Sequence, residues 1–312
     1  MKNKRYGLCL SGGGARGAAH IGVLKVLDKY LNITELCGVS AGAIVATSYA
    51  ANKLKKLERR VNKLTEEDTK QLFKFSKSPY GLFSSEVIED FVRGIVGNIK
   101  LQDLNKPAIV AASDIKHGRL VFFKRGSVAK VVAASSAIPG IFTPVKIGNM
   151  LLLDGGLYNN LPYYALEKKV DEIIPIDVGT SAEIAHIKSK LRKTTKAIAS
   201  LKQDLNMLKS EFRIIKGSAP INKIRETKSI IKMIETIKKG KDNKTLKLIY
   251  QSVLSFMSEF LANQITSSNK NNIIFVRPEI NHLDFANSKK AIPYGERAAK
   301  KFLIEQGILK SK

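Results

Sequence analysis

Short apolar runs alternate with amphipathic segments over the first 180 residues of the chain. The runs stop at glycines or polar turns, whereas the segments between them place apolar residues three or four positions apart, as Ile21, Leu24 and Leu27 do. The first pattern predicts buried strands and the second predicts helices. We expect strands at 6–10, 36–39, 108–113, 119–124, 150–153 and 172–178, and helices at 18–30, 41–51 continuing into 53–64, 85–95 and 128–134.

Strands that alternate with helices are typical of a mainly parallel sheet that is covered on both faces. The order of elements therefore predicts an α/β protein with three layers, α/β/α, around a mainly parallel central sheet. A further strand at 273–276 and a helix at 295–306 return to the same pattern and complete this core.

A different pattern occupies the region after Gly179. Apolar residues follow 3-4 spacing from Ile184 to Ile215 and again from Leu246 to Phe260, with a turn at Gly217 to Pro220 between them. This predicts a helical insertion whose apolar stripes pack on each other, on a second subunit or on lipid. We divide the chain into a core at 1–180, a basic helical insertion at 181–270, acting as a cap, lid or dimer arm, and the closing strand and helix of the core at 271–312.

The charge of the chain is strongly positive. Its 53 Lys and Arg residues face 27 Asp and Glu, for a formal net charge of +26, and residues 181–270 hold nineteen basic residues against seven acidic ones. Lys predominates over Arg, and no zinc-finger or aromatic RNA-binding signature accompanies it, so nucleic acid is not expected as a partner. Either Lys solvates helix surfaces, or the insertion binds an anionic membrane surface peripherally.

Targeting signals are weak in this sequence. The most apolar stretch, 36–51, is too short and too interrupted to span a bilayer, and the run at 8–10 breaks into glycines, which disfavours a signal peptide. Cys9 and Cys37 make no disulfide framework and are expected to be small core residues. We therefore expect a cytoplasmic protein that is peripheral at the membrane.

A glycine-rich loop follows the first predicted strand. Ser11 to Gly17 reads SGGGARG and contains G-x-G-x-x-G, a spacing that also suits a dinucleotide-binding turn. That function requires an acidic residue at the end of the second strand, some twenty positions on. Glu35 is near that distance but falls before the predicted second strand, which disfavours nucleotide binding.

The second motif is Gly38-Val39-Ser40-Ala41-Gly42, a G-x-S-x-G sequence between a predicted strand and a predicted helix. Small residues flank the serine because a sharp turn must expose its hydroxyl. The backbone N–H groups that open the following helix are suited to receive an oxyanion. The motif predicts that Ser40 is a nucleophile.

A serine nucleophile needs a base. Asp154 ends the apolar run 151–153 and is followed by Gly155 and Gly156, which allow close backbone approach; its plain alternative is a turn-forming Asp-Gly. A Ser–acid–His triad would also need a histidine. The four histidines are His20, in the first helix, His117, in a turn, His186, in the insertion, and His282, after the last strand, where a triad histidine remains an alternative.

These motifs, taken in order, resemble the three signature blocks of the patatin-like phospholipase family. The stretches 134–144 and 154–162 are similar to stretches of its bacterial members, and residues 81–84 are similar to them more loosely. The resemblance covers about residues 6–179 and the closing strand and helix, but not the insertion. It implies a lipid acyl hydrolase of the phospholipase A or lysophospholipase type, which cleaves carboxylic esters of membrane lipids through an acyl-enzyme.

The resemblance also implies roles for individual residues. Ser40 and Asp154 would form a catalytic dyad without histidine. The loop residues Gly12, Gly13, Gly14 and Arg16 would supply backbone N–H groups to the oxyanion hole, while the Arg16 side chain either anchors the loop or meets a phosphate headgroup.

Other functions remain open at this point. A lipid acyltransferase would use the same acyl-serine, and a non-catalytic membrane- or protein-binding module would keep only the fold. No H-E-x-x-H, close Cys/His cluster or calcium-loop pattern occurs, so no metal and no cofactor are expected and hydrolysis should be calcium-independent. The expected partners are a lipid ester substrate, an anionic membrane and a second copy of the chain bound through the insertion.

Overall fold

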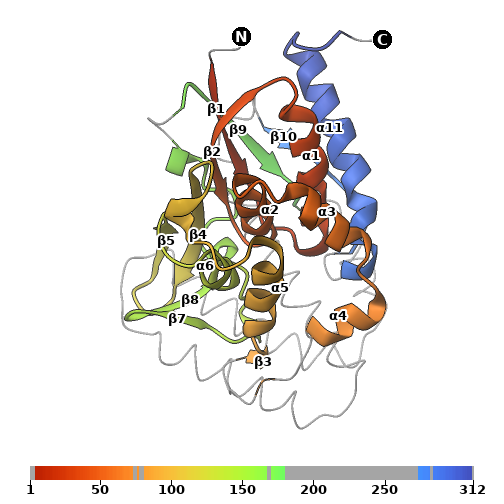
Figure 1. Cartoon of the computed structure of the whole chain (residues 1–312). Helices are drawn as coiled ribbons and strands as arrows, with labels where there is room; N and C mark the ends of the chain where they lie inside the picture. The colour runs from red at the N-terminus through yellow and green to blue at the C-terminus, as the bar shows by residue number, and fades with distance from the viewer. Residues whose placement is uncertain are drawn as a thin grey trace, which may run out of the picture. The chain divides into compact units, whose positions relative to one another are not determined.

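The computed structural model describes residues 4–72, 76, 81–166, 170–179, 273–281 and 284–310 (Figure 1). All of them belong to one unit, made of Met1–Gly179 and Leu261–Lys312. The other unit, Thr180–Phe260, lies outside the described residues, and with it the predicted helices of the insertion. The division at 1–180, 181–270 and 271–312, and the dimer or membrane role of the insertion, therefore stay predictions.

The elements of the described part follow the predicted order, with additions. The strands are β1 (Arg5–Leu10), β2 (Asn32–Gly38), β3 (Gly81–Phe83), β4 (Ala108–Asp114), β5 (Arg119–Phe123), β6 (Gly140–Phe142), β7 (Val145–Ile147), β8 (Met150–Asp154), β9 (Glu172–Asp177) and β10 (Ile274–Phe275). The α-helices are α1 (Ala19–Leu27), α2 (Ala41–Ala50), α3 (Leu54–Asn62), α4 (Glu66–Leu72), α5 (Glu86–Val96), α6 (Val128–Ser135) and α11 (Ile292–Glu305). Short 3-10 helices are η1 (Gly14–Ala18), η2 (Leu101–Asp103), η3 (Gly155–Leu157), η4 (Tyr163–Leu166) and η7 (Phe285–Ala291).

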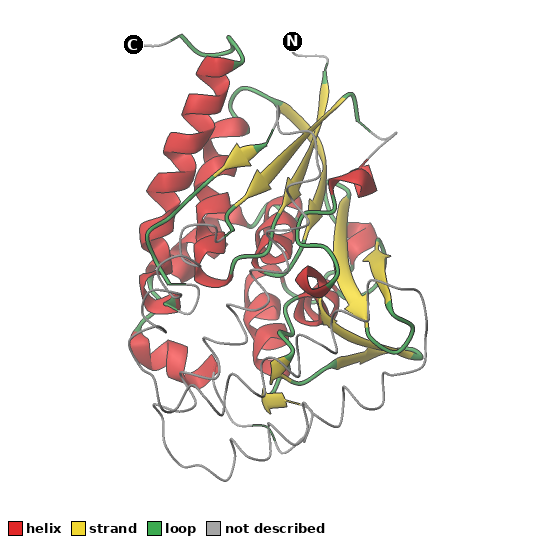
Figure 2. Cartoon of the chain, turned by 180° about the vertical axis from the view of Figure 1, so that it is seen from behind, coloured by secondary structure: helices red, strands yellow, loops and turns green. Residues whose placement is uncertain are grey.

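The central sheet runs in the order β10-β9-β1-β2-β4-β8-β7, with β5 also paired to β4 (Figure 2). Neighbouring strands from β10 to β4 are parallel, whereas β8, β7 and β5 join antiparallel. Helices α2 and α6 contact the sheet, and η4 contacts β1, β2 and β9. The predicted three-layer α/β/α fold is confirmed, with a sheet that is parallel in its centre and mixed at one side.

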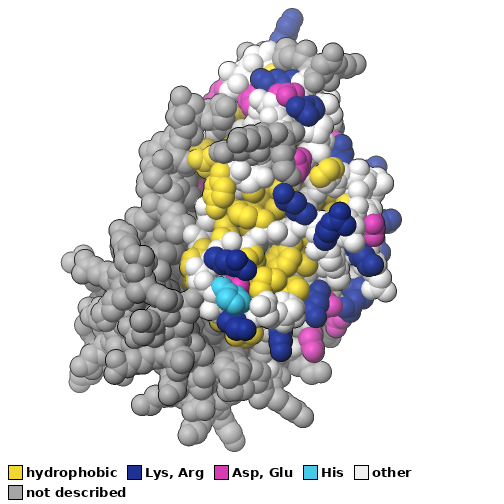
Figure 3. Space-filling model, turned by 90° about the vertical axis from the view of Figure 1, so that its left-hand side faces the viewer, with side chains coloured by type: hydrophobic (Ala, Val, Ile, Leu, Met, Phe, Trp, Pro, Cys, Tyr) yellow, Lys and Arg dark blue, Asp and Glu magenta, His cyan; other side chains and the backbone are white. Residues whose placement is uncertain are grey.

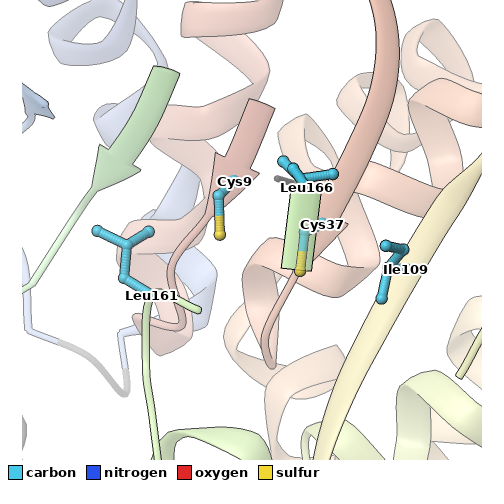
Figure 4. Close-up of a cluster of buried hydrophobic side chains, with 5 residues drawn as sticks. All are labelled: Cys9, Cys37, Ile109, Leu161 and Leu166. Atoms are coloured by element: carbon cyan, nitrogen blue, oxygen red, sulfur yellow. The ribbon is translucent and has the colours of Figure 1, made fainter. Parts of the chain in front are cut away.

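The core is continuous through the sheet. From Tyr6 to Leu10 every residue of β1 is buried, as expected for a strand covered on both faces. Cys9 and Cys37 are opposite each other on β1 and β2, and they pack with Ile109 and Leu166 in one buried cluster (Figure 4). Both cysteines are free thiols, and burial raises the pKa of Cys9 well above its usual value. The prediction that they are core residues is confirmed.

Two predicted helix boundaries were wrong. The second helix does not continue into 53–64, because Asn52 adopts a left-handed backbone with φ of 57° and separates α2 from α3. The last helix begins at Ile292 instead of Gly295, since Pro293 fits the first turn of a helix, where its missing N–H is not needed.

The side of the molecule on which β5 lies carries hydrophobic side chains among Lys and Arg (Figure 3). Four of the five β5 residues are only half-buried, and the ring of Phe122 meets Tyr164 edge-on at 5.8 Å between centroids. Within the described ranges, no helix combines the length and the apolar character that crossing a membrane demands.

Candidate functional site

Ser40 occupies a strained turn between β2 and α2. Its φ of 52° and ψ of −124° are rare for a residue with a side chain, and such conformations persist only where neighbours hold them. The Ser40 N–H donates to Ser135 Oγ at 2.8 Å, and the Ser135 hydroxyl donates to the Ala111 carbonyl at 2.6 Å. Ser135, at the end of α6, thus fixes the turn to β4.

The glycines of the second motif allow this turn to lie against β1. A Cβ on Gly42 would come within 2.3 Å of the Leu10 carbonyl oxygen, which is impossible for any larger residue without movement. The Val39 N–H donates to the same carbonyl at 3.1 Å. The G-x-S-x-G turn therefore packs directly against the end of β1, where the glycine-rich loop begins.

Asp154 reaches Ser40 through the register of β4. In that strand Val110 is opposite Gly38 of β2, and Ala112 is opposite Asp154 of β8, so β4 connects the ends of two strands far apart in sequence. Asp154 is 4% exposed, and its carboxylate accepts the Gly156 N–H at 2.8 Å. It lies near enough to the Ser40 side chain for that hydroxyl to lower its pKa.

The environment of Asp154 changes its proton affinity. Burial raises its pKa to about 6, and the hydrogen bonds from Ser40 and Gly156 oppose that rise. A carboxylate with this pKa is a stronger base than one on the surface, and it is still largely ionised at neutral pH. The arrangement is able to accept the proton of the Ser40 hydroxyl.

The glycine-rich loop is held against the two motifs by Asn160. Gly12 N–H donates to Asn160 Oδ1 at 3.0 Å, and Asn160 Nδ2 donates to the Gly12 carbonyl at 3.2 Å. A Cβ on Gly12 would be 3.1 Å from the Ser40 Cβ, so the loop borders Ser40. The Arg16 N–H donates to the Gly13 carbonyl. The Gly12 and Arg16 N–H groups therefore already have acceptors inside the protein and are not available to bind an oxyanion.

The Arg16 side chain anchors the loop. It is 4% exposed, its Nε donates to the Ile280 carbonyl at 2.8 Å, and a terminal nitrogen donates to the Gly179 carbonyl at 3.4 Å. Of the two roles expected for this side chain, these contacts favour anchoring over headgroup binding.

Neither described histidine contacts the Ser40 side chain. His20 is buried, its Nε2 hydrogen-bonds the Ser11 carbonyl at 2.9 Å, and burial lowers its pKa to about 4. His117 pairs with Asp114 in the turn after β4. His186 and His282 lie outside the described residues, so the triad alternative stays a prediction.

An apolar pocket of about 130 Å³ opens at Ser40. Its walls come from the glycine-rich loop, α2, α3, α5 and η7, with Val45, Leu57 and Phe91 among the lining side chains. A cavity of about this size in a protein core accepts a six-carbon ring. The pocket therefore suits a short length of hydrocarbon chain beside Ser40.

No cluster of His, Cys, Asp and Glu suited to hold a metal ion occurs within the described ranges. Glu35, considered above as a nucleotide contact, lies inside β2 and is buried. Sequence reasoning missed the positioning roles of Ser135 and Asn160, although both fall in the stretches 134–144 and 154–162 that carry the resemblance.

Comparisons with known proteins point in the same direction. Residues 8–166 match the family model described as Patatin-like phospholipase. An uncharacterized NTE family protein of Mycobacterium tuberculosis is 38% identical over 159 residues, which is 51% of this chain and 44% of that protein. Lysophospholipase NTE1 of Debaryomyces hansenii is 29% identical over 199 residues, covering 58% of this chain and 12% of that protein.

The chain thus spans less than half the length of these curated relatives. Among solved structures, VipD from Legionella pneumophila aligns with a TM-score of 0.47 and 16% identity over 97% of this chain and 67% of that one.

Proposed function

Because this chain belongs to the patatin-like phospholipase family, as the resemblance implied, we propose that it is a serine lipid acyl hydrolase acting on carboxylic esters of phospholipids or related lipids. The observation that carries the proposal is a buried Asp154 carboxylate that interacts with the Ser40 side chain, together with an apolar pocket that Ser40 lines. The lysophospholipase named among its relatives supports the lipid class of the substrate.

In the proposed mechanism, Ser40 Oγ attacks the ester carbonyl carbon while Asp154 accepts the hydroxyl proton. The bond to the alcohol then breaks, the proton passes from Asp154 to the leaving alcohol, and the acyl group stays on Ser40. In the second half-reaction, water attacks this ester and gives a proton to Asp154. The bond to Ser40 Oγ then breaks, Asp154 returns the proton to Oγ, and the fatty acid is released.

The oxyanion is proposed to form against the glycine-rich loop. Gly14 opens η1 and lines the pocket beside Ser40, so its N–H is the loop donor that the geometry favours, together with the N-terminus of α2. One such donor is typically worth about 2.7–4 kcal/mol of transition-state stabilisation. This stabilisation compensates for the weakness of the Asp154 carboxylate as a base for the serine hydroxyl.

The apolar pocket is proposed to hold the acyl chain next to the scissile carbonyl. It buries hydrocarbon without offering a partner to a charged group, so the headgroup must lie outside it. A calcium-independent reaction follows from this machinery, since every step uses side chains and backbone groups of the protein. Excess chelator should therefore leave the hydrolysis rate unchanged.

The test is hydrolysis of a short-chain p-nitrophenyl ester and a fluorescent phospholipid. The wild type should hydrolyse both, whereas Ser40→Ala and Asp154→Asn should lose about a thousandfold or more in kcat, and His282→Ala should stay active. A folded but inactive His282→Ala would replace the dyad by a triad. A wild type that is inactive on every ester would contradict the hydrolase proposal, and transfer of the acyl group to an added alcohol in place of water would favour the acyltransferase.

A further inference from the structure

A groove of about 520 Å³ is lined by residues of α3 and α5, two of the helices that also wall the apolar pocket. Phe91 and Ile95 of α5 form an apolar floor, and a Cβ on Gly94 would meet nothing within 4 Å, so the floor has open space above it. The groove is distinct from the pocket at Ser40, but both are lined by Phe91.

The charge on one wall of this groove is concentrated and largely uncompensated. Helix α3 contributes Lys56, Arg59 and Arg60, and the residue that caps its end is Lys63; all four side chains are exposed. Within the described part of the chain, the only ion pair made by these four side chains is a long one, from Arg60 to Asp68 at 3.8 Å. We call these four residues the α3 basic wall.

The opposite wall does not neutralise the α3 basic wall. Its one acidic residue, Asp90, is already paired with Arg93 of its own helix at 2.5 Å. Among the described residues, Arg59 donates to a backbone carbonyl, that of Lys55, and no carboxylate there cancels its charge. A cluster of cations above an apolar floor attracts an anion that carries hydrocarbon.

Helix α3 connects the groove to the proposed acyl site. Its buried face, Leu57 and Val61, lines the apolar pocket, while its other face bears the α3 basic wall. A surface that binds phosphates at this wall would therefore present acyl chains to the pocket one helix diameter away, about 10 Å. The spacing matches a lipid whose headgroup stays at the interface while its chain enters the protein.

Resting on the hydrolase function proposed above, we propose that the α3 basic wall docks the protein on anionic phospholipid, with lipid phosphates bound in the α3–α5 groove. The partner is a lipid surface, because the floor is apolar and adjoins the acyl pocket through Phe91. Nucleic acid would use the charge but not the floor. The basic insertion is not required for this docking.

The experiment is co-sedimentation of the full chain with vesicles of phosphatidylcholine alone or mixed with phosphatidylglycerol, over a series of salt concentrations. The wild type should bind the mixed vesicles more tightly, and added salt should weaken that binding. Arg59→Glu combined with Lys63→Glu should lower the partition coefficient at least about tenfold. The matched control, Lys300→Glu with Lys301→Glu, makes the same charge change on exposed positions of α11 and should lower it far less.

Each outcome decides the proposal. A charge-retaining pair, Arg59→Lys with Lys63→Arg, should keep wild-type binding, and thermal unfolding of each variant checks that it is folded. Equal loss in the α11 control would mean that net charge alone binds the membrane, and unchanged binding in the α3 pair would place the docking elsewhere. Either result overturns the proposal, as would tighter binding to a DNA duplex than to vesicles.

The hydrolase function is read separately from wild-type hydrolysis of a soluble p-nitrophenyl ester. An active wild type whose α3 pair binds vesicles normally refutes the docking surface and leaves the hydrolase intact. An inactive wild type that binds anionic vesicles through α3 refutes the hydrolase while the surface stands.

Discussion

The side-chain amide of Asn160 pairs with both backbone groups of Gly12, accepting from its N–H at 3.0 Å and donating to its carbonyl at 3.2 Å. Asn160 is 7% exposed and follows Asp154 by six positions, whereas Gly12 is 148 residues earlier in the chain. The pair therefore ties the glycine-rich loop to the turn that holds the proposed base. The two parts of the proposed site are held in one geometry.

Replacing Asn160 tests whether this tie positions the oxyanion loop. In Asn160→Ala both Gly12 groups lose their partner in a buried site, which should cost about 1–3 kcal/mol of unfolding free energy. Misplacing the loop by an ångström should lower kcat up to about a hundredfold, with KM for a soluble ester little changed.

The matched control for that variant is Asn159→Ala. Asn159 Oδ1 accepts a hydrogen bond from the Leu161 N–H at 2.9 Å. Among the described residues, Asn159 makes no hydrogen bond to the glycine-rich loop. Steady-state kinetics and urea unfolding of both variants make the comparison. Equal kcat in the two variants would show that Asn160 has no special role.

The pH dependence of the reaction follows from Asp154. Because the carboxylate must be ionised to accept the Ser40 proton, and burial raises its pKa to about 6, activity should be low in acid and rise with pH to a plateau, with a midpoint near 6. A profile of kcat/KM against pH on a soluble ester measures this midpoint. A midpoint near 4, the value of an ordinary carboxyl, would mean that the carboxylate is not the buried one described above.

The same burial makes Asp154 a cost to stability at neutral pH. Its folded-state pKa of about 6 exceeds the unfolded value of about 3.9, so the folded state prefers the protonated carboxyl. The contribution of this preference to the free energy of unfolding is present in full below pH 3.9 and is lost as the pH rises through 6. At pH 7 the ionised group destabilises the fold by about 3 kcal/mol, at two pKa units of 1.36 kcal/mol each.

Asp154→Asn should therefore be inactive but more stable than the wild type at about pH 8, because the amide oxygen still accepts the Gly156 N–H without a charge. The advantage should shrink at about pH 5, where the wild-type carboxyl is mostly protonated. Urea unfolding at both pH values gives the difference. A stability gain that is the same at both would rule out the titration of Asp154 as its cause.

The crossing of α1 and α11 depends on glycine. A Cβ on Gly295 would be 1.9 Å from the Ala19 carbonyl oxygen, so Gly295→Ala should force the helices apart and cost about 1–3 kcal/mol or more. Gly94 lies within α5 with open space around its Cα, and Gly94→Ala should instead add up to about 1 kcal/mol through helix propensity. Thermal unfolding should show shifts of opposite sign; two losses of equal size would contradict this account.

The apolar pocket predicts how acyl-chain preference changes. Val45 on α2 lines it and is 3% exposed, so Val45→Phe should fill the pocket and lower kcat/KM for long-chain esters at least about tenfold, while acetyl and butyryl esters stay near wild type. Val45→Ala enlarges the same space and should shift the preference to longer chains. A series of p-nitrophenyl esters measures both, and a uniform loss over all lengths in Val45→Phe would place the acyl chain elsewhere.

The sequence alone predicted the order of the main strands and helices, without the short β3, β6 and β7 or helix α4, and it pointed to the candidate nucleophile and base. The strand-turn-helix context of Ser40 and the apolar run before Asp154 are local patterns, and backbone sterics and burial act on them over a few residues. Helix ends were harder. The reversal at Asn52 needs only one left-handed residue, which no periodicity reveals.

Only the tertiary structure decided which groups meet. The hydrogen bonds from Ser40 to Ser135, from Gly12 to Asn160 and from Arg16 to Ile280 join residues 95, 148 and 264 positions apart. No local propensity encodes such contacts, because they arise only when β2, β4 and the antiparallel β8 come together in one sheet and bring the segments that follow them into contact. The raised pKa of Asp154 has the same origin, since burial is a property of the assembled core and not of the Asp-Gly-Gly sequence.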